Sequence, residues 1–475
     1  MKINLRVVLS LLMCVCLLSA CTSDVETDGE NTVPDVSEQP TAEELELPNG
    51  KFLDGDTFNM YHCHGYFDFY DVKDPASGNL MHEAVIQRND AVEERTGVNL
   101  NHVHTPTPQD QGANRDFIAS LILAGDTTYD AFVHVQHTGM PGLINEGMFV
   151  DWNKLPHIDF SKPWWYSNAI RDISFGDKVF AMTGDYNLPT FAVTECLAFN
   201  KDMMDELELE YPYQHVFDGT WTHDKFVEYI QAATKDLNGD GQMDYDNDRY
   251  GFGGWQYEQV QALYVGYGGQ TLVKDDFNLP KLNIYSEQQN NVIDKMIEVF
   301  ENTGAFYHGT KYGLEDTMFK EGRLLFNDAF LNFIPGTRNY DIEVGFVPYP
   351  KISEEQENYY SRTANISCLT YIPITLSEER YETVGGTLES MAYYSGKIVL
   401  PTYFDTILTV QSTRDVESEQ MIPNIKDSCR FMDMAIGFSP EQFVYSGQNT
   451  LASHWVSTKT AYEEKLKTLV QTYSE

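Results

Sequence analysis

Oxygen-bearing side chains are concentrated at residues 236–244, in the run Asp-Leu-Asn-Gly-Asp-Gly-Gln-Met-Asp. Their spacing matches a calcium-binding loop, in which the first, third, fifth, seventh and ninth residues supply oxygen atoms to the ion. The ligands predicted by this match are Asp236, Asn238, Asp240, the backbone carbonyl of Gln242, and Asp244. Gly241 occupies the sixth position, where such a loop turns sharply. Carboxylates this close together repel one another unless a cation lies between them, so the sequence predicts a structural Ca²⁺ ion in a surface loop.

One departure from the calcium pattern leaves an alternative open. The twelfth position is Asn247, whereas a complete loop has a Glu that binds the ion through both carboxylate oxygens. A solvated turn without a metal ion is compatible with the same Asn-Gly-Asp-Gly sequence. The predicted ligand set leaves no open coordination position, so an ion bound here would stabilise the fold rather than catalyse a reaction.

A second group of candidate residues follows two predicted strands. The segments 58–63, 98–104 and 129–135 have the apolar pattern of strands, and helices are predicted between them. This β-α-β-α-β order predicts a mostly parallel sheet, whose ligand site lies beyond the carboxyl ends of its strands. The side chains predicted to bind a ligand there are His64, Tyr66 and His137. The alternative for each is packing in the core, which is the commoner role of an isolated ring.

The first 47 residues are predicted to be a targeting segment and a tether. An apolar run over residues 7–18 is shorter than the roughly 20 residues that span a bilayer, and it ends in Leu-Ser-Ala-Cys at 18–21. This ending resembles the lipobox of bacterial lipoproteins, which implies a signal peptide over residues 1–20 and a lipid on Cys21. An ordinary secretory signal is the alternative. Residues 21–47 carry many acidic side chains and no basic one, which predicts a disordered tether.

The formal net charge of −40, from 32 basic and 72 acidic residues, limits the partners of this chain. Nucleic acid and anionic lipid are disfavoured as ligands, whereas a neutral ligand or a cation is not. The remaining chain is long enough to predict two lobes. Four cysteines without metal-binding spacing lie in this part, and buried thiols are predicted for them in preference to one or two disulfides. They are Cys63, Cys196, Cys368 and Cys429.

Short motifs occur along the chain in an order that resembles a known family. They include Phe-Asn-Lys-Asp at 199–202 and Gly-Thr-Trp-Thr at 219–222, and the others lie at 142–148, 321–328, 344–351 and 414–418. Together with the lipobox, this order resembles the extracellular solute-binding proteins of ABC importers, in particular the carbohydrate-binding family that includes maltose-binding protein. The resemblance implies an α/β, two-lobed periplasmic-binding-protein fold of type II, with a hinge and a ligand cleft between the lobes.

The resemblance also implies where the lobes and the ligand contacts lie. Lobe 1 is expected at 48–198 and 326–375, and lobe 2 at 199–325 and 376–475, the last stretch being its C-terminal helical part. By their order in the chain, Trp255 and Tyr257 correspond to ligand contacts of the second lobe. Asn327, Asp328 and Phe330 correspond to a wall of the first lobe. An aromatic platform with amide and carboxylate groups at its rim suits a sugar ring, which has apolar faces and polar edges.

The function implied by the resemblance is capture of a solute for an ABC importer. The preferred solute is a carbohydrate or oligosaccharide, delivered to the transmembrane subunits of the permease. The implied protein is monomeric, binds no nucleic acid, catalyses no reaction, and is anchored through Cys21 at the extracytoplasmic face of the cell membrane.

Two other classes of protein remain as alternatives. A secreted glycoside hydrolase needs two carboxylates across the scissile bond, and in so acidic a chain any such pairing is uninformative. A surface adhesin would show internal repeats or an all-β pattern, and the sequence has neither.

Overall fold

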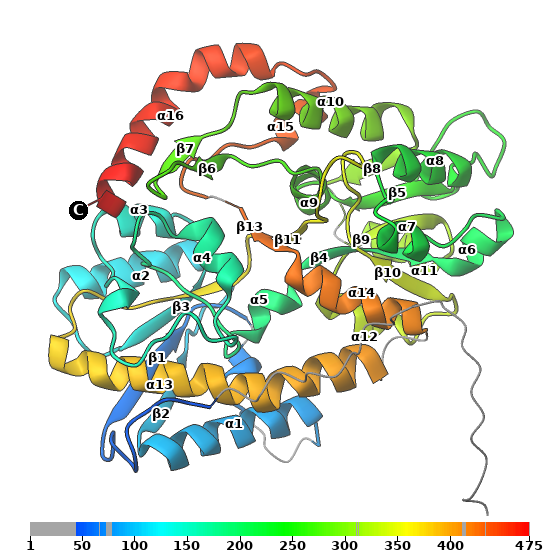
Figure 1. Cartoon of the computed structure of the whole chain (residues 1–475). Helices are drawn as coiled ribbons and strands as arrows, with labels where there is room; N and C mark the ends of the chain where they lie inside the picture. Colours follow the sequence, from blue (N-terminus) through cyan, green and yellow to red (C-terminus); the bar gives the residue numbers. More distant parts are fainter. Residues whose placement is uncertain are drawn as a thin grey trace, which may run out of the picture. The chain divides into compact units, whose positions relative to one another are not determined.

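The structure is a computed structural model that describes residues 44–65, 67–72, 78–309, 311, 313–410, 415–432 and 434–474. Residues Leu45–Glu475 form one compact unit, whose elements are labelled in Figure 1. The predicted signal peptide, Cys21, most of the tether and Tyr66 lie outside the described residues. None of the helices in the described part of the chain combines the length and apolar character needed to cross a bilayer.

A four-stranded sheet in the order β12-β3-β1-β2 forms the first half of this unit. Strands β1 (Thr57–His62), β2 (Asn99–His104) and β3 (Ala131–Val135) are parallel, and β12 (Cys368–Tyr371) adds to β3 in the antiparallel direction. Helices α1 (Leu80–Thr96) and α2 (Gln111–Leu123) connect the parallel strands, which confirms the predicted β-α-β-α-β order. Helix α1 ends at Gly97 with φ of 84°, where a Cβ atom would also lie 2.8 Å from the Lys51 Cβ.

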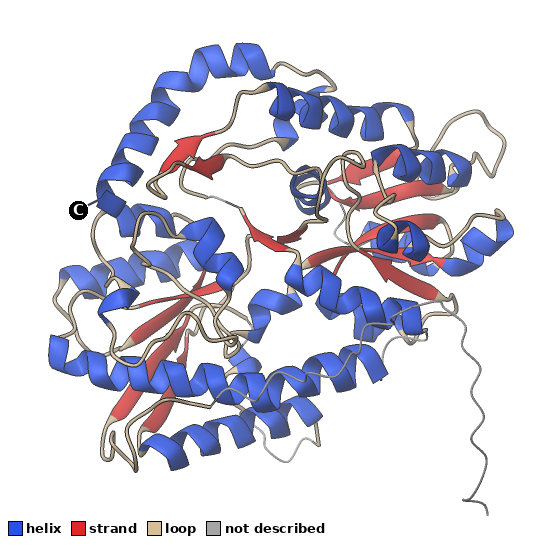
Figure 2. Cartoon of the chain, viewed as in Figure 1, coloured by secondary structure: helices blue, strands red, loops and turns tan. Residues whose placement is uncertain are grey.

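A five-stranded sheet in the order β10-β4-β9-β5-β8 forms the second half, and Figure 2 shows both sheets in red. Strands β5 (Tyr250–Trp255), β8 (Ala305–His308) and β9 (Leu324–Phe330) are parallel. Strands β4 (Glu195–Asn200) and β10 (Val344–Val347) are antiparallel to their neighbours. The side chain of Asn200 accepts a hydrogen bond from the Met203 amide and so caps the helix that follows β4.

The remaining strands and α-helices cover the sheets and connect them. The strands are β6 (Leu272–Lys274), β7 (Pro280–Leu282), β11 (Ser361–Thr363) and β13 (Cys429–Phe431). The earlier helices are α3 (Met140–Asn145), α4 (Ser167–Ile173), α5 (Leu188–Ala192), α6 (Lys201–Glu206), α7 (Tyr213–Phe217), α8 (His223–Ala233) and α9 (Glu258–Gly266). The later helices are α10 (Glu287–Asn302), α11 (Leu314–Lys320), α12 (Ile334–Thr337), α13 (Tyr381–Tyr394), α14 (Val416–Asp427), α15 (Glu441–Ser446) and α16 (Leu451–Ser474).

The predicted lobe boundaries differ from the way the strands pair. The boundary at 198/199 falls inside β4, and the boundary at 325/326 falls inside β9. Both strands belong wholly to the second sheet. β9 forms backbone hydrogen bonds with β4 on one side and with β5 on the other, so neither β4 nor β9 is divided between two lobes. Within 326–375, β12 joins the first sheet as expected, whereas β10 joins the second. Within 376–475, α13 packs against α1 and β1 of the first sheet, while α14 packs against β10.

The four cysteines in the described part of the chain are buried free thiols, as predicted. Cys196 lies in β4, Cys368 in β12 and Cys429 in β13. Burial raises the pKa of each of these thiols, so they are unreactive side chains that pack as small apolar groups.

An aromatic cluster around Phe326 of β9 lies at the centre of the apolar packing on the second sheet. The Phe326 ring is fully buried and lies 5.3 Å from Phe226, 5.7 Å from Trp221 and 6.4 Å from Tyr229, between ring centroids. We expect Phe326→Ala to lower the free energy of unfolding by about 3–5 kcal/mol, since the substitution leaves a cavity. Phe277→Ala is the matched control, because Phe277 is 80% exposed. Urea denaturation of both variants measures the difference, and equal losses would contradict this account of the core.

Candidate functional site

The predicted ligand contacts at the edge of the first sheet are only partly accessible. His64 is 1% exposed and contacts the rings of His62 and Tyr70, and its backbone carbonyl accepts a hydrogen bond of 2.7 Å from Nε2 of His104. Burial lowers the pKa of His64 to about 3, so this imidazole is neutral at physiological pH. His64 is therefore part of a buried aromatic group.

The end of β3 is more open. His137 is half-buried, and its Nδ1 donates a hydrogen bond of 2.8 Å to the carbonyl of Asn365. The next residue, Thr138, has φ of 65°, which a β-branched residue rarely adopts. Backbone strain of this kind is concentrated at functional sites, which agrees with a ligand position beyond the carboxyl end of β3.

The candidate residues of the second sheet lie on two neighbouring strands. Trp255 ends β5 and is half-buried, and Tyr257, just before α9, is 45% exposed. Asn327 of β9 is buried and donates a hydrogen bond of 2.8 Å to the Asp316 carboxylate. Asn327 is the register partner of Gly253, so the structure brings these two groups of candidates side by side.

One expectation for this group was wrong. Asn327, Asp328 and Phe330 were placed on a wall of the first lobe, but β9 is hydrogen-bonded between β4 and β5 in the second sheet. The cause is long-range pairing, which the order of motifs along the chain does not report.

A buried network of charged groups surrounds Asp328 and the start of β4. The Arg362 guanidinium of β11 lies 2.5 Å from the Glu195 carboxylate and donates a second hydrogen bond to the Gln261 side chain of α9. Glu195 and Arg362 are 0% and 1% exposed. Burial raises the pKa of Glu195 above its usual range. Burial likewise raises the pKa of Asp328 to about 8, with a contribution from the nearby Glu258 carboxylate. Carboxylates outnumber cations here, so the network holds a proton at neutral pH.

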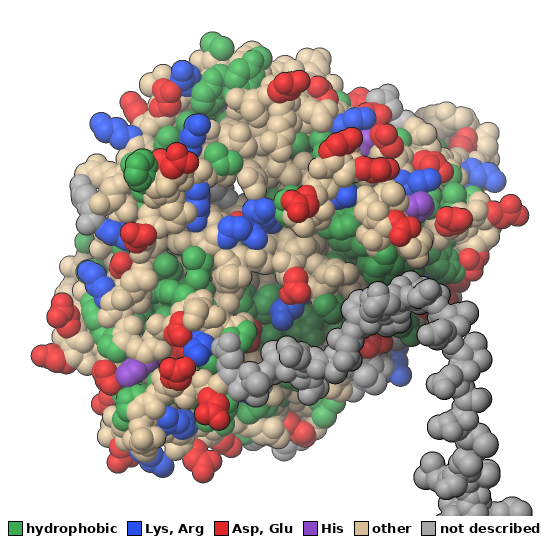
Figure 3. All heavy atoms as spheres, viewed as in Figure 1, with side chains coloured by type: hydrophobic (Ala, Val, Ile, Leu, Met, Phe, Trp, Pro, Cys, Tyr) green, Lys and Arg blue, Asp and Glu red, His purple; other side chains and the backbone are tan. Residues whose placement is uncertain are grey.

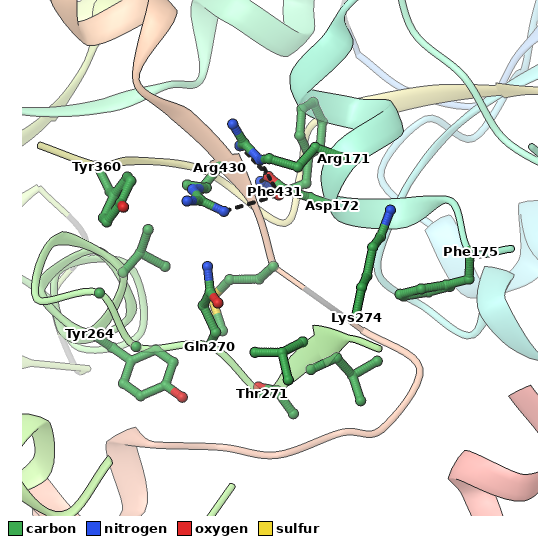
Figure 4. A pocket seen from close by; sticks show the side chains of 16 residues that line it. Arg171, Asp172, Phe175, Tyr264, Gln270, Thr271, Lys274, Tyr360, Arg430 and Phe431 are labelled. Atoms are coloured by element: carbon green, nitrogen blue, oxygen red, sulfur yellow. Dashed lines mark hydrogen bonds and ion pairs between the residues drawn. The ribbon is translucent and has the colours of Figure 1, made fainter. Parts of the chain in front are cut away.

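A cavity of about 250 Å³ lies between α4, the segment 264–274, Tyr360 and the strand β13 (Figure 4). Its aromatic lining comes from Phe175, Tyr264 and Tyr360, and its polar lining includes Gln270 and Thr271. The seven predicted ligand contacts that the structure describes do not line it, and the eighth, Tyr66, is outside the described residues. The cavity combines apolar ring faces with hydrogen-bonding groups, as a binding site for a small polar molecule does.

Asp172 organises the charges at this cavity. Its carboxylate accepts hydrogen bonds from Nε and Nη2 of Arg171, at 2.6 and 2.7 Å, and from Nη1 of Arg430 at 3.3 Å. The Phe431 amide donates a further bond of 3.0 Å. Figure 4 shows Arg171 and Arg430 converging on this carboxylate from α4 and β13. Asp172 therefore ties α4 to a strand that follows it by more than two hundred residues.

Sequence reasoning missed the residues of this cavity. Arg171 and Asp172 lie in a short helix with no motif, Arg430 lies in the three-residue strand β13, and Tyr360 comes just before the three-residue strand β11. The sequence held one general indication of this site. Basic residues are scarce, 32 against 72 acidic ones, so two arginines at one carboxylate are unusual.

The predicted calcium loop is an exposed turn between α8 and β5. Gly241 has φ of 82°, the sharp turn expected at the sixth position. Both oxygens of Asp236 accept backbone hydrogen bonds, from Gly239 at 2.6 Å and Gly241 at 2.8 Å. Across the described residues, no group of three or more His, Cys, Asp or Glu side chains is arranged to hold a metal ion. The turn at Gly241 agrees with the predicted loop, and calcium binding stays a prediction.

The sequence matches the family of bacterial extracellular solute-binding proteins over residues 81–368, more than half of the chain, so the protein belongs to this family. That assignment confirms the resemblance inferred from the motifs and places the protein outside the cytoplasm. It is a family of binding proteins, in agreement with the expectation that this chain binds rather than catalyses. No functionally curated protein matches the sequence.

Solved structures show the same two-lobed fold at low sequence identity. A cyclo/maltodextrin-binding protein complexed with maltotetraose aligns with a TM-score of 0.54 and 14% identity, covering 88% of this chain and 96% of that one. The cyclic alpha-maltosyl-1,6-maltose binding protein from Arthrobacter globiformis gives 0.52 and 13%, covering 88% and 97%. The maltose/maltodextrin-binding domain MalE from Bdellovibrio bacteriovorus, bound to maltotriose, gives 0.51 and 13%, covering 88% and 100%.

The raised pKa of Asp328 predicts how stability depends on pH. The unfolded carboxyl titrates near about 3.9, whereas the folded group titrates at about 8, so the folded state binds more protons between these values. Its contribution is therefore present at low pH and is lost as the pH rises toward about 8. We expect Asp328→Asn to flatten the fall in Tm between about pH 4 and about pH 8, because the amide cannot ionise and its oxygen can still accept from the Tyr349 hydroxyl.

Thermal unfolding across a pH series measures this effect. The matched control is Asp276→Asn at an exposed position. A slope for Asp328→Asn as steep as that of the wild type would show that this carboxyl is ionised in the folded state.

Proposed function

We propose that the protein captures a carbohydrate outside the cytoplasm and delivers it to the transmembrane subunits of an ABC permease. The observation that carries the proposal is the cavity of about 250 Å³ whose walls come from α4, the 264–274 segment, Tyr360 and the strand β13. Family membership supports the solute-binding role. The sugars in the titles of the aligned structures support the class of solute.

The lining of the cavity suits a short saccharide. Phe175, Tyr264 and Tyr360 offer apolar ring faces, and Gln270 and Thr271 offer groups that can bond hydroxyls. The volume is close to the lower end of the range for small-molecule sites, roughly 300–1,000 Å³. A ligand in this position contacts both α4 and the 264–274 segment. Its binding therefore favours the hinge state in which these two segments lie closest together.

The anchoring is part of the same proposal. Lipid on Cys21 would hold the protein at the membrane, since two or more acyl chains give stable binding. The acidic segment that follows would keep the body away from the membrane surface but within reach of the permease. Metabolic labelling with a radioactive fatty acid, compared between the wild type and Cys21→Ser, tests this step.

A thermal-shift scan of mono- and oligosaccharides, amino acids and peptides tests the solute class. We expect a saccharide to raise Tm, because a ligand at 100 times its Kd adds about 2.7 kcal/mol to the free energy of unfolding. Tyr360→Ala should then weaken binding by about 1–3 kcal/mol through loss of the ring. Trp255→Ala, measured in parallel, tests the alternative position at the end of β5.

Three results would contradict the proposal or its placement. Binding of peptides or amino acids alone would exclude the carbohydrate class. Wild-type affinity in both variants would exclude both positions of the ligand. Turnover of a chromogenic glycoside would favour the hydrolase instead.

We also propose that the 236–244 loop binds a structural Ca²⁺ ion. Its oxygen spacing and the left-handed Gly241 support the ion, and the loop is mostly exposed and contributes no residue to the lining of the cavity. Chelation should lower Tm of the metal-loaded protein, because an ion that binds the native state stabilises it by mass action. Asp240→Ala should remove this sensitivity and leave saccharide affinity unchanged. Asp276→Ala is the control, and an unchanged melting curve on adding EDTA to calcium-loaded protein would exclude the ion.

A further inference from the structure

The cavity of Figure 4 is basic, although the chain as a whole is strongly acidic. Among the described residues that line it, three are basic, Arg171, Lys274 and Arg430, and one is acidic, Asp172. The full chain has more than two acidic residues for each basic one. Figure 3 shows Lys and Arg side chains gathered near the middle of this face, over the place where Figure 1 draws β13. The bias at the cavity therefore runs against the composition of the protein.

Arg430 has hydrogen-bonding capacity to spare. Of its five N–H donors, one reaches Asp172 at 3.3 Å, while Nε is buried and has no partner among the described residues. The guanidinium lies 4.3 Å from the centre of the Tyr360 ring, and the side chain is 19% exposed. The aromatic contact fixes the guanidinium plane, so its unused donors are held in place before a ligand arrives.

The single carboxylate at the cavity does not neutralise the cations. Asp172 is shared by Arg171 and Arg430. Among the described residues, Lys274 on β6 donates a hydrogen bond to the Ile170 carbonyl alone, at 3.3 Å, and its ammonium lies 5.6 Å from the Phe175 ring. Burial lowers the pKa of Lys274, the Asp172 carboxylate opposes this shift, and Arg171 adds a smaller contribution that lowers the pKa further. An anion in the cavity would relieve both the unpaired ammonium and the unused guanidinium donors.

We propose that the solute is an acidic saccharide, whose uronate carboxylate binds between Arg430 and Lys274. This inference rests on the proposed carbohydrate-binding function and names the class of sugar. A planar carboxylate matches the fork of a guanidinium, while the sugar ring lies against Tyr264 or Tyr360. The net charge of −40 repels polyanions at longer range, so the site suits a short oligosaccharide with few charges.

Isothermal titration calorimetry on the full mature protein tests the proposal. The probes are galacturonate and glucuronate di- and trisaccharides, the methyl esters of the same sugars, maltotriose, and a sulfated disaccharide. We expect each acid to bind at least tenfold more tightly than its ester, a difference of about 1.4 kcal/mol. The preference should shrink as ionic strength rises, because the charges are partly exposed.

Substitutions locate the charge. Arg430→Gln should weaken uronate binding at least tenfold and leave the affinity for the methyl ester within about twofold, an energy difference of about 0.4 kcal/mol. Arg430→Lys should restore part of the affinity, since it keeps the charge but loses the fork. Lys274→Gln is the independent variant should Arg430→Gln fail to fold. Lys459→Gln is the matched control, because Lys459 is on α16 and 52% exposed.

The outcomes separate this proposal from the one on which it rests. Equal affinity for acids and esters, or binding of maltotriose without any uronate, overturns the acidic saccharide and leaves the carbohydrate-binding function standing. A preference for the sulfated disaccharide overturns the carboxylate in favour of a sulfate ester. Failure of every saccharide, acidic and neutral, refutes the proposed function itself.

Discussion

The ion pair between Arg362 and Glu195 ties the short β11–β13 pair to the start of β4 in the second sheet. Arg362 lies on the three-residue strand β11, Glu195 is the first residue of β4, and both side chains are almost wholly buried. Removing one partner of such a pair leaves an uncompensated buried charge, which costs about 3–5 kcal/mol. Arg430 on β13 is the register partner of Arg362, and it binds Asp172 of α4. The two paired strands are thus joined to different elements: Arg362 joins β11 to β4, and Arg430 joins β13 to α4.

The pairing of β11 with β13 explains why charged side chains lie beside the proposed binding cavity. Two three-residue strands have few backbone hydrogen bonds, so side-chain pairs contribute much of what fixes them. Asp172 satisfies Arg430 through one long bond of 3.3 Å, whereas Glu195 approaches Arg362 at 2.5 Å. The Arg430–Asp172 pair borders the cavity, and Arg430 has N–H donors that this pair does not use. The Arg362–Glu195 pair is buried in the core. The same residue type therefore has a structural role at one position and remains available to a ligand at the other.

The parts of the fold that depend on local pattern were predicted, and those that depend on distant pairing were not. Apolar periodicity located the first three strands, and Gly97 ended α1 as expected. Motif order identified the family but placed β9 in the wrong lobe, because the antiparallel pairing of β9 with β4 joins residues far apart in sequence. The cavity has the same origin: Asp172 and Arg430 are separated by 258 positions, and no local spacing announces their contact. The turn at Gly241 could be predicted because the candidate calcium loop lies within nine residues, and its binding of calcium remains untested.

A large negative net charge and a basic cavity are compatible, because they act over different distances. Exposed charges are screened beyond about 10 Å in moderate salt, so the acidic surface sets solubility and long-range repulsion. Inside the cavity the lower dielectric makes nearby groups decisive, and there Arg171, Lys274 and Arg430 face one carboxylate. An acidic surface around a basic cavity admits a small anion but repels long polyanions and nucleic acid. The net charge that disfavours nucleic acid as a partner is thus compatible with a singly charged sugar, since the groups at the cavity decide the binding of so small a ligand.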